Sequence, residues 1–165
     1  MPLRSICNKP MRGFTLIELI FVILLIGVLS AVAIPKFSGM RDNAKVTSEL
    51  STAASVQTAI DACHGEWIIN EGNFRCGKDI DPSDPSDFNA SSGYPLRLGS
   101  GDTTPLDRIL KNGSNVKWVR ESSGHYRGPA SNNGVKRQLR GKPDFDDYWV
   151  YESATGEFRL VENNE

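Results

Sequence analysis

The sequence has few of the residues from which enzymes build active sites. Its two histidines, His64 and His125, are isolated along the chain, and its three cysteines form no Cys-x-x-Cys pair. It also lacks a Gly-x-Ser-x-Gly nucleophile motif and a Gly-Lys-Ser/Thr phosphate loop. We therefore predict that the protein is not an enzyme and has no cofactor and no metal centre of histidine and cysteine ligands.

An excess of positive charge is absent as well. The chain carries 19 basic and 20 acidic side chains, which give a net charge of −1 and argue against a general nucleic-acid binder. One basic stretch contains Lys136, Arg137, Arg140 and Lys142. We interpret it as a solvated loop, because few aromatic residues interleave it, and contact with nucleic-acid phosphates is the alternative.

A single long apolar run lies near the N-terminus. Residues 14–34 are apolar apart from Thr15, Glu18 and Ser30. As a helix this run would span roughly 30 Å, the thickness of a bilayer core. No small-residue cleavage pattern ends it, which excludes an ordinary secretory signal peptide. A carboxylate at the centre of such a helix costs on the order of 3 kcal/mol, so Glu18 is expected to have a partner.

Residues 12–19, with the sequence Arg-Gly-Phe-Thr-Leu-Ile-Glu-Leu, resemble the prepilin leader site of type IV pilins and type II secretion pseudopilins. The resemblance implies that a prepilin peptidase cuts between Gly13 and Phe14 and that the new Phe14 amine is N-methylated. It also implies that Glu18 meets the N-terminal amine of a neighbouring subunit. An ordinary signal anchor with an incidental acid is the alternative.

The resemblance further implies a function. We expect a structural subunit of a type IV pilus-like filament, homo-oligomeric or mixed, which inner-membrane machinery assembles from subunits held in membrane lipid. A type II secretion pseudopilin is an alternative, as is a minor tip or DNA-uptake pilin that acts as a binding module. For a structural filament subunit, nucleic acid is not an expected partner.

The basic leader predicts the orientation in the membrane. Arg4, Lys9 and Arg12 precede the apolar run without an acid among them, so the positive-inside rule places the N-terminus in the cytoplasm. We therefore expect a single-pass protein of the bacterial inner membrane that later forms a periplasmic or extracellular filament.

The expected fold is α+β and pilin-like, with one long N-terminal helix packed against a small antiparallel sheet. Residues 1–13 are assigned to a cleaved leader and residues 14–35 to the transmembrane or filament-core helix. Residues 36–64 are assigned to an amphipathic continuation of that helix, and residues 65–165 to a globular β-rich head.

The amphipathic part of the helix rests on periodicity. Apolar or small residues recur three or four positions apart between Phe37 and Cys63, while charged residues such as Lys45 and Glu49 are assigned to other faces. Gly65 is expected to cap the helix after His64.

The cysteines favour a disulfide. Cys7 lies in the leader, so Cys63 and Cys76 would remain as an even pair in the exported part, where oxidation is permitted. Two free thiols or half of a metal site are the alternatives.

The head is expected to consist mainly of short strands. We predict a strand at 66–69, a turn at 70–73, a long surface loop over 79–101, a short helix at 105–110 and a strand at 116–120 followed by a turn at 122–124. A hairpin is predicted from strands at 148–151 and 157–161.

Two acidic groups supply oxygen ligands without a recognisable calcium motif. Asp79, Asp81, Asp84 and Asp87 fall within nine positions but lack the EF-hand order. Asp144, Asp146 and Asp147 form the second group. We interpret the first as solvated, with calcium as the minor alternative, and we assign no metal to the second.

Overall fold

The computed structural model describes residues 13–70, 74–113, 117–136 and 138–163. Residues 1–12 of the expected leader lie outside this range, as do the turn positions 71–73, Val116 and Arg137. The chain divides into two compact units, Met1–Met40 and Arg41–Glu165.

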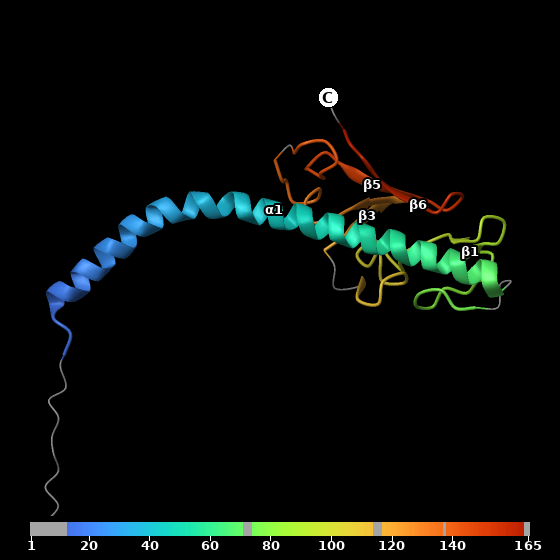
Figure 1. The fold of residues 1–165 in the computed structure, drawn as a ribbon, viewed down its shortest axis with the longest axis horizontal. Coiled ribbons are helices and arrows are strands. Elements are labelled where there is room, and N and C mark those ends of the chain that lie inside the picture. Colours follow the sequence, from blue (N-terminus) through green and yellow to red (C-terminus); the bar gives the residue numbers. More distant parts are fainter. Residues whose placement is uncertain (1–12, 71–73, 114–116, 137, 164–165) are drawn as a thin grey trace, which may run out of the picture. The chain divides into compact units, whose positions relative to one another are not determined.

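Within the described residues one helix precedes six short strands (Figure 1). The elements are α1 (Leu16–Asn70), β1 (Phe88–Asn89), β2 (Tyr94–Pro95), β3 (Val119–Ser122), β4 (His125–Arg127), β5 (Tyr148–Glu152) and β6 (Glu157–Val161). Helix α1 continues through Pro35, and its residues up to Met40 belong to the first unit.

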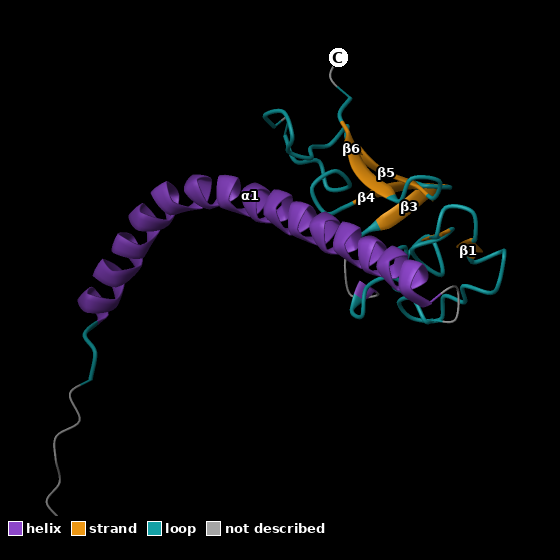
Figure 2. Cartoon of the chain, turned by 45° about the vertical axis from the view of Figure 1, so that its right-hand side comes forward, coloured by secondary structure: helices purple, strands orange, loops and turns teal. Residues whose placement is uncertain are grey.

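The second unit is built from the C-terminal part of α1 and an antiparallel sheet. The sheet has the strand order β3-β4-β5-β6, and β1 pairs with β2 in a separate two-stranded ribbon (Figure 2). In the main sheet Trp149 lies opposite Tyr126 on one side and Leu160 on the other. The α+β prediction, with a small antiparallel sheet, is therefore confirmed.

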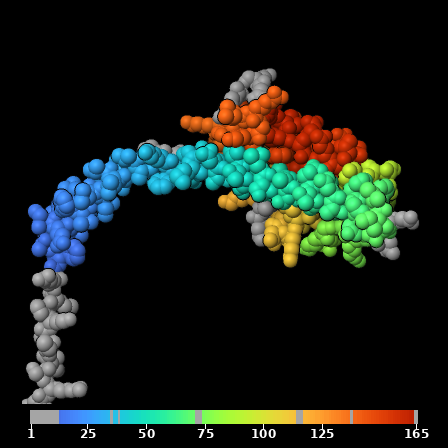
Figure 3. Space-filling model, in the orientation of Figure 1, coloured from blue at the N-terminus to red at the C-terminus, as the bar shows by residue number. Residues whose placement is uncertain are grey.

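A stripe of α1 packs against aromatic side chains of the sheet. Val56 and Ile60 are fully buried in a core that also contains Trp118, Trp149 and Phe158. The Trp149 and Phe158 rings stack with centroids 5.3 Å apart. Figure 3 shows the C-terminal hairpin, in red, lying along this part of the helix. These contacts join the helix and the sheet into one core.

The helix is longer than predicted. It ends at Asn70 and not at His64, so the expected strand at 66–69 is wrong. Trp67 continues the three-to-four spacing of the buried stripe, packs against the core and stacks on His64 with centroids 5.5 Å apart. Packing of this side chain outweighs the tendency of Gly65 to end a helix.

Three smaller differences lie in the head. The expected helix at 105–110 is a series of turns, in which Leu106 and Ile109 are buried and the Leu110 N–H donates to Leu106 O over 3.0 Å. The 79–101 loop contains β1 and β2, and strand β4 was not assigned from the sequence. The turn at 122–124 and the β5–β6 hairpin agree with the prediction.

Cys63 and Cys76 form a disulfide, which links the helix to the segment that follows it. Their Cα atoms are 5.1 Å apart, and both residues are buried in the core. The disulfide interpretation is therefore the correct one among the three alternatives.

We expect reduction of this disulfide to lower the free energy of unfolding of the head by about 3 kcal/mol, because the crosslink restricts the unfolded chain. The measurement is urea unfolding of the processed chain in detergent, with and without reductant, followed by circular dichroism. A double Cys63→Ser, Cys76→Ser variant is the control, and reductant should not weaken it further. Equal midpoints for oxidised and reduced wild type would contradict the prediction.

Candidate assembly segment and the buried carboxylate of the head

The first part of α1 presents an apolar surface with nothing packed on it. Residues Leu16–Ile34 are long and apolar enough to cross a membrane, and none of this segment is buried within the described structure. Leu16, Ile17 and Phe21 expose between 62% and 76% of their surface. An apolar surface of this size is unfavourable in water, so it requires lipid or other apolar helices around it.

Thr15 caps helix α1, which begins at Leu16, two residues later than the expected start at Phe14. The Glu18 N–H donates to Thr15 Oγ1 over 3.3 Å and to Thr15 O over 3.1 Å. This is the side-chain half of a capping box, Thr-x-x-Glu. Gly13 and Phe14 precede the helix and are exposed. The bond between them is therefore outside the hydrogen-bonded helix and reachable from solvent.

Glu18 is exposed on the first turn of the apolar segment. No ion pair to its carboxylate is formed by any residue within the described ranges. Its position near the helix N-terminus is favourable for a negative charge. The three residues implied by the resemblance, Gly13, Phe14 and Glu18, thus lie within the first six described positions.

A second carboxylate, Glu49, is completely buried in the head. Its Oε2 accepts hydrogen bonds from the Ala130 N–H over 2.7 Å and the Ser131 N–H over 3.1 Å. Its Oε1 accepts from the Ser131 hydroxyl over 2.9 Å and from Trp149 Nε1–H over 2.8 Å. Four donors surround one buried charge, which is the arrangement that makes such burial tolerable.

The assignment of Glu49 to a solvated face of the helix was wrong. Val46, Glu49, Ala53 and Val56 are all buried and lie three or four positions apart. The signal was present in this spacing, because Glu49 occupies a core position of the stripe. The charge of Glu49 led to the wrong assignment, because glutamates are rarely buried unless they are paired.

Gly128 allows the loop to approach Glu49. A Cβ atom at Gly128 would lie 2.4 Å from the Glu49 side chain, closer than any side chain tolerates. The Gly128 N–H instead donates to the Ser131 hydroxyl over 3.0 Å, which orients that hydroxyl beneath Glu49. Glu49 thus fastens the loop before β5, and β5 itself through Trp149, to the helix.

Five of the seven acidic side chains in the two groups accept hydrogen bonds within the head. Asp81 accepts from the Ser83 N–H and hydroxyl, which lowers its pKa, and Asp84 accepts in the same way from Ser86. Arg108 donates to both carboxylate oxygens of Asp87. That hydrogen bonding lowers the pKa of Asp87.

The second acidic group closes the turn before β5. Asp144 accepts from the Gln138 and Asp146 N–H groups, and Asp147 accepts from the Asp144 and Asn163 N–H groups. Burial raises the pKa of Asp147. Among the described residues no cluster of three potential metal ligands occurs.

The basic stretch stays on the surface. Lys136, Arg140 and Lys142 are exposed, and Arg140 lies 3.8 Å from Glu162. Arg137 is outside the described residues. His64, between Trp67 and Tyr94, stacks on Tyr94 with centroids 4.3 Å apart and so has a packing role.

Comparison with known proteins places the N-terminal region in a defined group. The model of the prokaryotic N-terminal methylation motif matches residues 8–34. A type IV major pilin protein of Neisseria gonorrhoeae is 28% identical over 138 residues, which cover 82% of this chain and 61% of the relative. A type IV major fimbrial protein of Dichelobacter nodosus is 40% identical over 98 residues, covering 52% of this chain and 63% of the relative.

A probable minor fimbrial protein of Dichelobacter nodosus is 34% identical over 77 residues, 47% of this chain and 45% of the relative. The chain thus spans between about half and three fifths of these relatives. No solved structure matches it. The chain thus carries the methylation motif, is similar in sequence to type IV pilin and fimbrial proteins, and has an apolar helix followed by an antiparallel sheet.

Proposed function

We propose that this chain is a structural subunit of a type IV pilus-like filament. The observation that carries the proposal is the wholly exposed apolar segment Leu16–Ile34, which holds a single carboxylate at its start. In a membrane the segment is solvated by lipid. In a filament, neighbouring helices replace the lipid, so little hydrophobic burial is lost on extraction.

Processing comes first in the proposed sequence of events. A prepilin peptidase cuts between Gly13 and Phe14 and the Phe14 amine is methylated, leaving a positive charge at the start of the helix. The exposed, non-helical state of these two residues supports this step, because a peptidase binds its substrate in an extended conformation. Thr15 caps the helix directly after these two residues, so the bond that is cut lies outside the helix.

Assembly then pairs opposite charges. Glu18 follows the new amine by four residues, and both groups are costly in an apolar environment when alone. An axial offset of one subunit that brings Glu18 beside a neighbour's Phe14 amine neutralises both. Because the contact is head-to-tail and does not close on itself, repeating it generates a helical filament.

A pilus is favoured over a secretion pseudopilus by the relatives, which are described as pilin and fimbrial proteins. The remaining parts of the proposal are the inner-membrane location, with the N-terminus in the cytoplasm, and an assembly machinery that extracts the subunit. No catalytic role is proposed for the chain.

Mass spectrometry of the assembled protein tests the proposal. We expect a mature N-terminus at Phe14 with an added methyl group, in protein recovered from sheared filaments. Gly13→Ala should slow or block cutting, because a side chain is introduced at the cleaved bond, whereas Gly27→Ala should be cut normally. Filaments that contain the intact leader would overturn the proposed function.

A further inference from the structure

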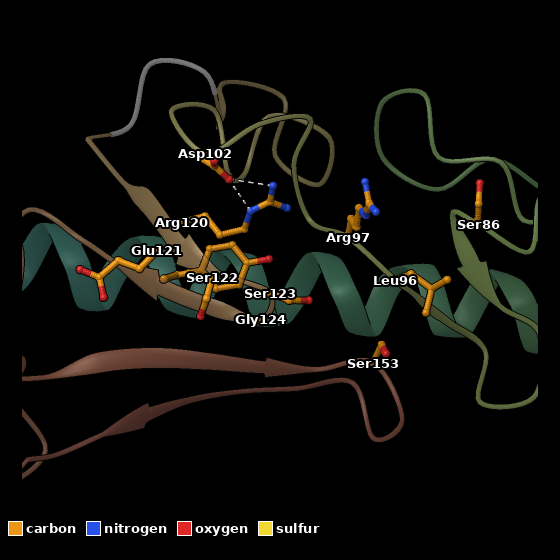
Figure 4. A pocket seen from close by; sticks show the side chains of 11 residues that line it. Ser86, Leu96, Arg97, Asp102, Arg120, Glu121, Ser122, Ser123, Gly124 and Ser153 are labelled. Carbon is orange, nitrogen blue, oxygen red and sulfur yellow. Dashed lines mark hydrogen bonds and ion pairs between the residues drawn. The ribbon is translucent and has the colours of Figure 1, made fainter.

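A cleft of about 550 Å³ opens in the head. Its walls come from the segment after β2, from the β3–β4 turn and from the β5–β6 turn (Figure 4). The side chains of five residues supply its main polar and apolar groups: Leu96, Arg97, Arg120, Ser123 and Ser153. None of them takes part in the Glu49 contacts.

Backbone hydrogen bonds fix the walls on either side of Arg97. The Leu96 N–H donates to Asp87 O over 2.8 Å, and the Ile109 N–H donates to Leu98 O over 3.1 Å. Arg97 therefore extends from a short segment whose two neighbours are held in place. In the view of Figure 4 the guanidinium groups of Arg97 and Arg120 extend to the same side. The cleft is thus largely formed before any ligand arrives.

Among the described residues, one cation of the cleft is left without an acid, although the lining contains two arginines and two acids. Arg120 donates to Asp102 Oδ1 through two nitrogens over 2.8 and 3.0 Å, and Glu121 lies 3.2 Å from Arg127. Each of these two arginines is therefore paired with an acid. Arg97, in contrast, forms no ion pair within the described parts of the chain.

The carboxylate of Asp87 does not remove this imbalance. Arg97 contributes to the lowered pKa of Asp87 through its charge, but Arg108 already occupies both oxygens of that carboxylate. The planar guanidinium of Arg97 retains its paired N–H donors, a geometry that suits a ligand carboxylate.

Two hydroxyl groups, those of Ser123 and Ser153, also line the cleft. The side chains of Ser123 and Ser153 make no hydrogen bond to other described residues, although the Ser153 carbonyl accepts one from the Ser92 hydroxyl over 2.7 Å. Both hydroxyls can donate and accept. Leu96, which exposes 37% of its surface, adds an apolar wall. The described lining thus combines one cation without an ion pair, two acids that are ion-paired with arginines, hydroxyl groups and a small apolar surface.

We propose that this cleft binds a small carboxylate that also carries hydroxyl groups, the chemistry of an acidic sugar. Arg97 holds the carboxylate, and Ser123 and Ser153 hydrogen-bond to the ligand hydroxyls. Binding at this site does not depend on filament assembly, so it can be tested separately from the proposed function.

The test is a titration of the full processed chain in detergent, with the arginine Nε–H signals followed by NMR. D-glucuronate is the probe, and D-glucose, acetate and inorganic phosphate are the comparison ligands. We expect glucuronate to shift the Arg97 signal and to bind at least about tenfold more tightly than glucose, which lacks the charge, or acetate, which lacks the hydroxyls.

Two variants make the test specific to the cleft. Arg97→Gln should weaken glucuronate binding about tenfold or more, because it removes the charge and keeps a polar side chain. Arg75→Gln, at an exposed arginine outside the lining, should leave it unchanged. Ser123→Ala is a second variant that keeps every charge and should weaken glucuronate more than acetate.

Four results would overturn the proposal. The first is equal binding of glucuronate and glucose, and the second is unchanged binding by a folded Arg97→Gln variant. The third is inorganic phosphate or acetate binding as tightly as glucuronate, which would show general anion attraction. Absence of any shift in the Arg97 signal would overturn it equally.

Discussion

Replacement of Glu18 by alanine should abolish filament formation while leaving a processed, membrane-inserted subunit with a folded head. Glu18 lies in the first unit and has no ion-pair partner among the described residues, so the head loses no described salt bridge. Insertion should survive, because removal of a charge makes the segment more apolar. What is lost in the proposed filament is the partner of the Phe14 amine.

The expected effect is large. An unpaired charge in an apolar environment costs about 3–5 kcal/mol, which is on the order of a hundredfold or more in each subunit association. The measurement compares processed protein in the inner membrane with protein in sheared filaments. Glu18→Gln should fail like alanine, because it keeps the shape and removes the charge.

An acidic side chain outside the apolar segment supplies the matched control. Asp42→Ala removes a carboxylate from the same helix, where Asp42 lies 3.9 Å from Lys45 on the surface, and it should assemble normally. A normal yield of filaments from Glu18→Ala would show that this carboxylate does not set the position of neighbouring subunits.

Replacement of Glu49 by alanine should unfold much of the head. The substitution leaves the Ala130 and Ser131 N–H groups, the Ser131 hydroxyl and Trp149 Nε1–H without their acceptor. Each buried donor left unpaired costs about 1–3 kcal/mol. We expect a loss of about 3–5 kcal/mol, because relaxation and entering water recover part of the sum. That is a large share of the 5–15 kcal/mol typical of a folded domain.

Urea unfolding of the processed chain in detergent, followed by tryptophan fluorescence, measures this loss. Glu66→Ala is the matched control, since Glu66 is exposed on the same helix, and it should change stability by no more than about 0.5 kcal/mol. Glu49→Gln should also be destabilised, because its amide N–H₂ would face donors. A Glu49→Ala head as stable as wild type would show that the four hydrogen bonds contribute little.

The features that could be predicted from the sequence are those that depend on neighbouring residues. The apolar segment and the β5–β6 hairpin each follow from a local pattern of apolar or turn-forming residues. The Cys63–Cys76 disulfide followed from the number of cysteines left after the leader.

The features that could not be predicted depend on distant residues. The end of α1 is set by Trp67, whose packing partners come from elsewhere in the head. Glu49 is buried with donors from Ala130, Ser131 and Trp149. The sequence around Glu49 does not show where these donors are. The cleft around Arg97 is likewise assembled from three separate turns, so its residues share no motif.

The distance in sequence between Glu49 and its donors also sets an order of events during synthesis. Glu49 is made 81 residues before Ala130 and 100 residues before Trp149, so this part of the head cannot close until most of the chain exists. Cys63 and Cys76 are only 13 residues apart, and their crosslink can form while β5 and β6 are still missing. Formation of the disulfide therefore requires neither β5 nor β6, whereas the complete set of donors around Glu49 requires Trp149 of β5.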